Sequence, residues 1–214
     1  MTIDFLGITL QSYSWQTVLG SSISGVFLGS IYALVALGLT LIYGVLHIIN
    51  FAHGSLLMLA MYAVFFLWNI LGLDPYLSML IVVPCGYLFG YTLQRTIIGK
   101  ASHGKDEITL LVMLGVSIIM ENTALFFFTA TDRSVRVAYD LDGFDLGVTY
   151  VVYPEIAALL GSLLITLVLW FFMSYTDTGK AIRAVSKEPQ GARLVGINVE
   201  HIFAVSFGIG TACV

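Results

Sequence analysis

The sequence predicts an all-α fold: a polytopic bundle of transmembrane helices, with five complete spans and a sixth that is cut off at the C-terminus. Hydrophobic residues make up 58% of the 214 positions and charged residues only 10%, which leaves too little polar surface to cover a soluble globule. No charged residue occurs between Asp4 and Asp74, a gap long enough for two apolar helices of about 20 residues. The apolar runs are continuous and lack the alternation of an outer-membrane barrel, so helices are the expected spanning form.

Five apolar stretches are long enough to cross a bilayer, and they cover residues 16–46, 55–73, 77–98, 108–130 and 156–175. A sixth begins near Ile202 and runs to Val214, which is shorter than the roughly 20 residues that a span needs. We therefore expect residues 1–214 to form a single transmembrane domain that is the N-terminal part of a longer chain.

The basic residues indicate an orientation. All nine Lys and Arg lie in the connections that follow the third, fourth and fifth spans, and these connections hold three, two and four of them. Because cytoplasmic loops carry the excess of Lys and Arg, the first and last of these connections are expected inside and residues 131–155 outside. The N-terminus is then outside, and the residues around Asn50 lie at the cytoplasmic side or are folded back into the membrane.

Small residues recur every four positions on two of the spans. They are Ser21, Gly25, Gly29 and Ala33 on the first span, and Gly86 and Gly90 on the third. Small side chains let helix backbones approach closely in a membrane, so both faces are expected to pack against other helices.

A polar stretch interrupts the apolar sequence after the first span. Its polar side chains are His47, Asn50 and His53. Gly44 precedes this stretch, Gly54 closes it, and Asn50 is well placed to cap a new helix. We expect one helix to end near Leu46 and a second to begin at about Gly54. Broken helices at membrane depth are tolerated where they line a cavity, and their free N–H groups attract carboxylates. The alternative is an ordinary cytoplasmic turn between two spans.

Glu121 falls in the middle third of the fourth span, where a carboxylate costs about 2.5–3.5 kcal/mol. Two interpretations remain open: a substrate or proton site, or a structural hydrogen-bonded pair with Asn122. No basic residue of the spans is placed to neutralise it, so a partner has to come from His47, His53 or elsewhere.

The segment after the fifth span is polar, basic and typical of short helices. Thr178 can cap a first helix that runs through Val185, and Pro189 fits the first turn of a second helix that stops at Gly196. The expected apolar faces are Ala181, Ile182 and Val185 on the first and Ala192, Leu194 and Val195 on the second. A solvated loop and a docking element for a soluble partner are both compatible with this pattern.

The sequence shows no motif for metal binding, hydrolysis, nucleotide binding or nucleic-acid binding. Cys85 and Cys213 have no CxxC or Cys/His spacing around them, so no metal site is expected and both cysteines read as small buried hydrophobic residues. Hydrolase and Walker motifs are absent, which argues against an enzyme and against a cofactor bound by this chain. Basic residues are not interleaved with aromatic ones, as nucleic-acid binding would require.

Two blocks carry a family resemblance. GSIYALVALGLTLIYGVLHIINFAHG and TGKAIRAVSKEPQGARLVGINVEHIFAVSFGIG look like the inner-membrane permease subunits of bacterial ABC importers for branched-chain amino acids, of the H-type. The resemblance implies a multi-pass subunit of the inner membrane, surrounded by lipid, that works with a second permease subunit, two cytoplasmic ATP-binding subunits and a periplasmic solute-binding protein. ATP would be used by those partner subunits.

The resemblance also implies roles for individual residues. The substrate pathway would be lined by Asn50, Phe51, His53 and Gly54. Glu121 and Asn122 are assigned to the same pathway because they are polar residues within the fourth span, and not because of the resemblance. The element that the ATP-binding subunit grips would include Gly179, Lys180, Arg183, Glu188, Arg193 and Gly196. Similar importers carry urea, short amides or other amino acids. A passive channel for a small polar solute and a purely structural scaffold are further alternatives.

Overall fold

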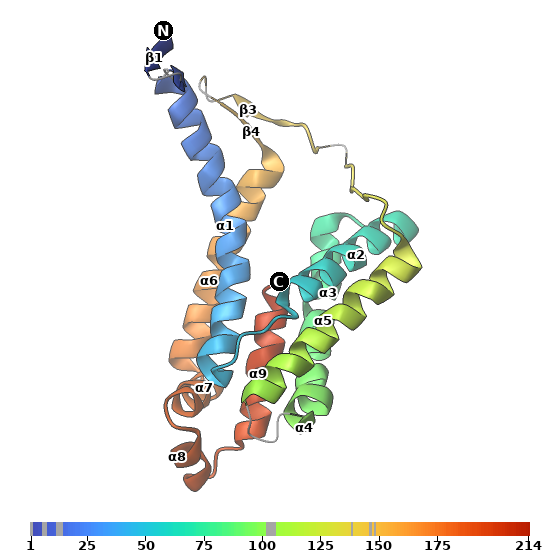
Figure 1. The fold of residues 1–214 in the computed structure, drawn as a ribbon, viewed down its shortest axis with the longest axis vertical. Coiled ribbons are helices and arrows are strands. Elements are labelled where there is room, and N and C mark those ends of the chain that lie inside the picture. Colours follow the sequence, from blue (N-terminus) through green and yellow to red (C-terminus); the bar gives the residue numbers. More distant parts are fainter. Residues whose placement is uncertain are drawn as a thin grey trace. The chain divides into compact units, whose positions relative to one another are not determined.

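The computed structural model describes residues 2–5, 8–11, 15–101, 106–137, 139–145, 147 and 149–214 (Figure 1). Within these residues, five helices are long and apolar enough to cross a membrane, which confirms the all-α polytopic fold. They are α1 (Trp15–Leu46), α2 (His53–Leu71), α3 (Pro75–Leu93), α5 (Asp106–Phe128) and α6 (Tyr153–Tyr175). The span begun by α3 continues through a π-helix, η1 (Gln94–Ile98), and α4 (Gly99–Ala101).

The remaining elements are short. They are the helices α7 (Asp177–Lys187), α8 (Pro189–Leu194) and α9 (Val199–Ala212), and the antiparallel strand pairs β1 (Thr2–Phe5) with β2 (Ile8–Gln11) and β3 (Gly143–Asp145) with β4 (Tyr150–Val152). The sixth apolar stretch is thus a helix, and it begins three residues before the predicted Ile202.

Contacts divide the chain into two compact units. The first comprises Met1–Ala33 and Val137–Leu164, and the second comprises Leu34–Arg136 and Ile165–Val214. In the second unit, α3 packs against both α2 and α9, and α2 also contacts α5 (Figure 1). All the candidate site residues fall in this second unit, so the site is described there.

Local sequence explains where α2 ends and α3 begins. Gly72 adopts a left-handed conformation with φ +64° and closes α2. Asp74 then accepts a hydrogen bond at Oδ1 from the N–H of Tyr76, at 2.9 Å, while Pro75 occupies the first helical position. A tight turn between two antiparallel spans follows from these residues.

Glycine contacts hold α9 between α1 and α3. A Cβ atom built on Gly38 of α1 would lie 2.6 Å from the carbonyl oxygen of Gly210, and one on Gly90 of α3 would lie 2.4 Å from Oγ1 of Thr211. A Cβ on Gly86 would make an ordinary contact, 3.6 Å from the carbonyl oxygen of Thr211. The backbones therefore touch where α9 is packed, as small residues in membrane helices allow. The sequence analysis did not single out Gly38 or Gly210.

The predicted small face of the first span has no such partner in the described part of the first unit. A Cβ added at Gly25 or Gly29 would meet nothing within 4 Å, and Ser21 and Ala33 are exposed. A packing role for this face stays a prediction.

Candidate functional site

The helix α1 ends because His47 adopts a left-handed conformation, with φ +56°. Its N–H still bonds to the carbonyl of Tyr43 at 2.8 Å, so the helical pattern continues up to this residue and then stops. Gly44, which precedes the polar stretch, lies inside α1. The predicted end at Leu46 is correct, but the conformation that produces it belongs to His47.

The chain then turns into α2 around Asn50. The Oδ1 atom of Asn50 accepts a hydrogen bond from the N–H of Ala52 at 3.0 Å, and its carbonyl accepts one from the N–H of His53 at 3.2 Å. The helix begins at His53, one residue before the predicted Gly54. Asn50 is 3% exposed and Ala52 is fully buried, whereas Ile49 and Phe51 are each 52% exposed, so one side of this irregular segment is buried and the other lies on the surface of the chain.

The start of α2 lies far from the end of α1. The Nε2 atom of His53 is 3.0 Å from the carbonyl oxygen of Val35, and Leu46 follows Val35 by 11 residues. At about 1.5 Å per residue, α1 therefore extends about 16 Å beyond the level at which α2 begins. Residues 47–52 therefore run back alongside α1, from its end toward its middle. This path favours a re-entrant segment over a turn at the membrane surface.

A contact with α5 gives the same depth independently. The Oγ atoms of Ser55, in the first turn of α2, and Ser117 are 2.7 Å apart. Ser117 lies 11 residues from Asp106 and 11 from Phe128, at the middle of α5. Because α5 is long enough to span the hydrocarbon core, α2 begins near half the depth of that span.

Glu121 is bound to this junction. Its Oε1 atom accepts hydrogen bonds from Oγ of Ser55 at 2.8 Å and from Oγ of Ser117 at 2.9 Å. The alternative pairing with Asn122 is wrong, because the Asn122 amide donates instead to the carbonyl of Ile118 in its own helix, at 2.8 Å. No local pattern could reveal Ser55 as the partner, since it lies 66 residues away in the sequence.

The predicted pathway residues thus divide into two groups. Asn50 and His53 are buried, and within the described residues their Nδ2 and Nδ1 atoms have no hydrogen-bond partner. Phe51, Gly54, Glu121 and Asn122 are exposed on the surface of this chain. The junction therefore carries polar groups both inside the protein and on its outer face at the same depth.

The helix α7 is capped by a residue other than the predicted one. The Oγ1 atom of Thr176 accepts a hydrogen bond from the N–H of Gly179 at 3.0 Å, so Thr176, and not Thr178, is the N-cap. The helix also extends beyond Val185, to Lys187. Gly179 is required for the close turn after α6, since a Cβ there would lie 2.5 Å from the carbonyl oxygen of Phe172.

The apolar faces of α7 and α8 behave differently. Ile182 and Val185 of α7 are fully buried, and with Ala192 of α8 they join one apolar cluster with Val45 at the end of α1. Leu194 and Val195, which were expected to complete the second face, are instead 89% and 76% exposed. The reason is that α8 ends at Leu194, with Gly196 at φ +87° directing the chain toward α9.

Polar contacts tie α7 to the membrane helices. Ser186 donates a hydrogen bond from Oγ to the carbonyl of Gly44, near the end of α1. Arg183 donates from its guanidinium to the carbonyl of Met173, in the last turn of α6.

Of the other predicted coupling residues, Gly179 is buried and the remaining ones are exposed. Lys180 forms an exposed ion pair with Asp177, at 3.0 Å. Glu188 and Arg193 are also exposed. These side chains remain available to a partner, whereas the Arg183 guanidinium is used within the chain.

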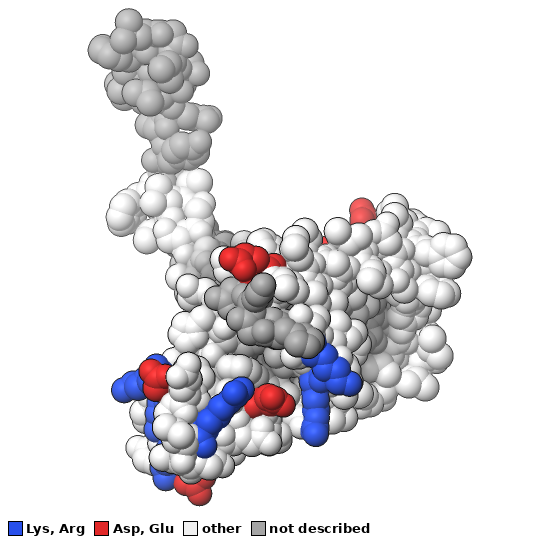
Figure 2. Space-filling view, turned by 60° about the horizontal axis from the view of Figure 1, so that its bottom comes forward, with Lys and Arg blue, Asp and Glu red and all other residues white. Residues whose placement is uncertain are grey.

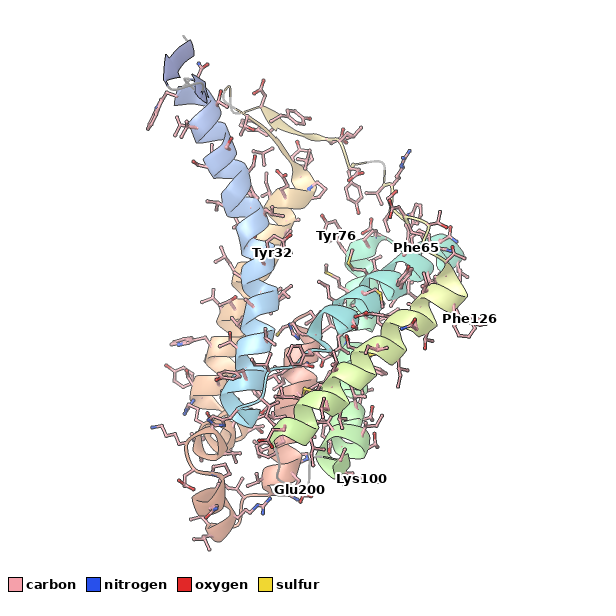
Figure 3. All side chains as sticks on the ribbon, in the orientation of Figure 1. Tyr32, Phe65, Tyr76, Lys100, Phe126 and Glu200 are labelled. Carbon is pink, nitrogen blue, oxygen red and sulfur yellow. The ribbon has the colours of Figure 1, made fainter. Side chains whose placement is uncertain are left out.

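The two ends of the second unit differ in chemistry. In Figure 3 the aromatic side chains Phe65, Tyr76 and Phe126 gather at one end, and Lys100 and Glu200 lie at the other. Figure 2 shows Lys and Arg side chains on the end that is turned forward there. Lys105, which contributed to the predicted orientation, lies outside the described residues.

Within the part of the chain that is described, no group of three or more His, Cys, Asp or Glu side chains is placed to hold a metal ion. Cys213 is buried as expected, but Cys85 is exposed on α3, so the expectation of a buried residue was wrong there.

A sequence model of the family "Branched-chain amino acid transport system / permease component" matches residues 4–213. The chain belongs to this family. Permease proteins of high-affinity branched-chain amino acid transport systems are similar along most of the chain. BraD of Pseudomonas aeruginosa is 28% identical over 202 residues, which cover 89% of this chain and 66% of BraD. LivH of Escherichia coli K12 is 29% identical over 206 residues, 88% of this chain and 65% of LivH.

A more distant relative, the probable branched-chain amino acid transport permease protein LivH of Methanocaldococcus jannaschii, is 27% identical over 191 residues, 80% of this chain and 56% of that protein. The chain thus spans 65–66% of the length of BraD and the Escherichia coli LivH. No solved structure matches. Together with the five apolar helices, the family places this permease component in the inner membrane as a multi-pass protein.

Proposed function

We propose that the chain is a permease subunit of an ATP-driven importer, which moves branched-chain amino acids from the periplasm to the cytoplasm. The observation that carries this proposal is the re-entrant segment, which brings polar groups and a helix N-terminus to about half the depth of α5. Unpaired polar groups at such a depth are costly unless they face a cavity or a ligand. A passage for a polar solute next to this segment would provide both the cavity and the ligand for these polar groups.

The N-terminus of α2 suits the carboxylate of an amino acid. The first turn of α2 has no side-chain cap, and the buried Nδ2 of Asn50 is an additional donor next to it. Free N–H groups and the positive end of the helix dipole attract anionic groups of solutes at the broken helices of transporters. We assign Asn50, Phe51, His53 and Gly54 to this part of the passage.

Coupling to ATP hydrolysis is proposed for α7 and α8. One of the two ATP-binding subunits would dock on this segment, with Gly179, Lys180, Glu188, Arg193 and Gly196 on or near the contact. The contacts between α7 and α1 support this proposal. Ser186 and the buried face of α7 contact the last turn of α1, and the re-entrant segment starts directly after that turn. A displacement of α7 would therefore be transmitted directly to the re-entrant segment, without another helix between them. Arg183 would act by fixing α7 to α6.

The remaining parts of the assembly follow from the same proposal. A second permease subunit would complete the passage, and a periplasmic solute-binding protein would deliver the amino acid. This chain would bind no cofactor itself, because ATP would be bound and hydrolysed by the partner subunits.

The passage is tested by replacing Asn50 and His53 with Ala in the complete transporter. We expect uptake of radiolabelled leucine to fall at least tenfold at equal membrane expression, because the re-entrant segment loses its polar groups. Asn69→Ala is the matched control, since Asn69 is exposed at the far end of the same helix. Unchanged uptake in both Asn50→Ala and His53→Ala would contradict the passage.

A further inference from the structure

Glu121 is held by two side chains that are themselves buried. Ser55 is 3% exposed and Ser117 is 6% exposed, and both donate to the same carboxylate oxygen, Oε1. Charge-assisted hydrogen bonds of this kind orient a carboxylate strongly. Within the described residues no hydrogen bond is formed to the other oxygen, so Glu121 presents a fixed acceptor on the outer face of the chain.

Contact with lipid tails would be unfavourable for the Glu121 carboxylate. It lies one helical turn from Ser117, the middle of α5, and the neighbouring Ile118 and Ile119 are exposed apolar residues. A carboxylate at this depth costs about 2.5–3.5 kcal/mol when it faces hydrocarbon. Among the described residues, Lys180 forms an ion pair with Asp177, which is far from Glu121 in this unit. No Lys or Arg of the described residues forms an ion pair with Glu121. If the carboxylate stays ionised, a positive group or water from outside the described chain has to stabilise it.

The same junction offers an anion site a few residues away. Ser55 belongs to the first turn of α2, whose uncapped N-terminus attracts negative charge. Ser55 therefore connects a negatively charged acceptor, Glu121, with the positive end of the α2 dipole. The two together match a molecule that carries an ammonium group and a carboxylate group close to each other. Urea and simple amides lack the ammonium charge and gain less from Glu121.

We propose that Glu121, positioned by Ser55 and Ser117, binds the ammonium group of an amino acid within the passage. This inference rests on the proposed function and names the chemical class of its substrate, a zwitterionic α-amino acid. A primary ammonium group has three N–H donors that can bond to the free carboxylate oxygen. The positive charge of the ammonium group compensates for the hydration that the carboxylate loses at this depth.

The test uses the complete transporter, with its second permease and ATP-binding subunits, in proteoliposomes supplied with the binding protein and radiolabelled leucine. Glu121→Gln keeps an oxygen that can accept from both serines, removes the charge and replaces the free acceptor oxygen with an NH2 donor. We expect leucine uptake to fall at least tenfold, while ATP hydrolysis stimulated by the loaded binding protein persists and the subunits still copurify. Glu107→Gln, a change at an exposed residue near the start of the same helix, is the matched control and should leave uptake unchanged.

Two results would overturn the inference. If Glu121→Gln transports leucine normally while Asn50→Ala does not, the passage stands and Glu121 is not an ammonium site. If Glu121→Gln no longer copurifies with the second permease subunit, the carboxylate faces a cation of that subunit instead of the substrate. Normal uptake in both Glu121→Gln and Asn50→Ala would mark a failure of the proposed passage itself.

Discussion

Gly90 sets the distance between α3 and α9, because its missing side chain leaves room for Thr211. A methyl group there would lie 2.4 Å from Oγ1 and 2.7 Å from Cβ of Thr211, which is closer than real contacts allow. We expect Gly90→Ala to lower the free energy of unfolding by about 1–3 kcal/mol through overpacking. Denaturant titration of the purified protein in detergent micelles measures this change.

Gly86→Ala serves as the control for that measurement. It lies one turn away on the same helix, and its added methyl group would make an ordinary contact at 3.6 Å. The two variants lose the same backbone flexibility, so a difference between them reports the contact with Thr211. Equal stabilities would show that α9 is not packed against Gly90.

Single residues were where the sequence was least informative. Glu121 was recognised as unusual from its depth, but its partners could not be, because Ser55 reaches it only after α2 and α5 pack together. His47 ends α1 in a left-handed conformation that glycine adopts more readily, so a histidine was not an obvious candidate. Both outcomes depend on tertiary contacts that local propensity does not contain.

At the scale of elements, α7 depends on the cap supplied by Thr176. Its hydroxyl accepts from the N–H of Gly179, whereas Thr178 is already inside the helix. We expect Thr176→Ala to cost about 1 kcal/mol of helix stability and to increase amide hydrogen exchange in the first turn of α7. Thr178→Ala should leave that exchange nearly unchanged. Greater exchange in Thr178→Ala than in Thr176→Ala would contradict the assignment of the cap.

The apolar helices were predictable because each needs a long run of apolar residues to cross a bilayer. All five begin within three residues of the predicted positions, and four of them also end within two. The interruption near Asn50 was recognised from its polar side chains. Its depth was not predictable. Sequence patterns show that a helix stops, but only the contacts of His53 with Val35 and of Ser55 with Ser117 show where the next one starts.

At the scale of the whole molecule, the distribution of Lys and Arg predicts which loops share one side of the membrane. In a variant with Cys85 and Cys213 replaced by Ser, we expect Cys introduced at Lys187 to react with an impermeant maleimide only from the cytoplasmic side. Cys introduced at Asp142 should react only from the periplasmic side, because the loop of residues 131–155 carries fewer basic residues. Mass spectrometry of labelled right-side-out and inverted vesicles checks both sites. Labelling at Lys187 only from the periplasmic side, with labelling at Asp142 only from the cytoplasmic side, would reverse the orientation and would exclude docking of ATP-binding subunits on α7.

The re-entrant segment has an electrical consequence. The energy needed to bring a dipolar molecule through a membrane grows with the thickness of the insulating layer that it must traverse without polar support. With the tip of α2 located about halfway along α5, that unsupported layer is reduced to roughly half of the 30 Å hydrocarbon core. In the proposed passage, the helices around this point would have to open only the remaining half of that layer to connect one aqueous compartment with the other.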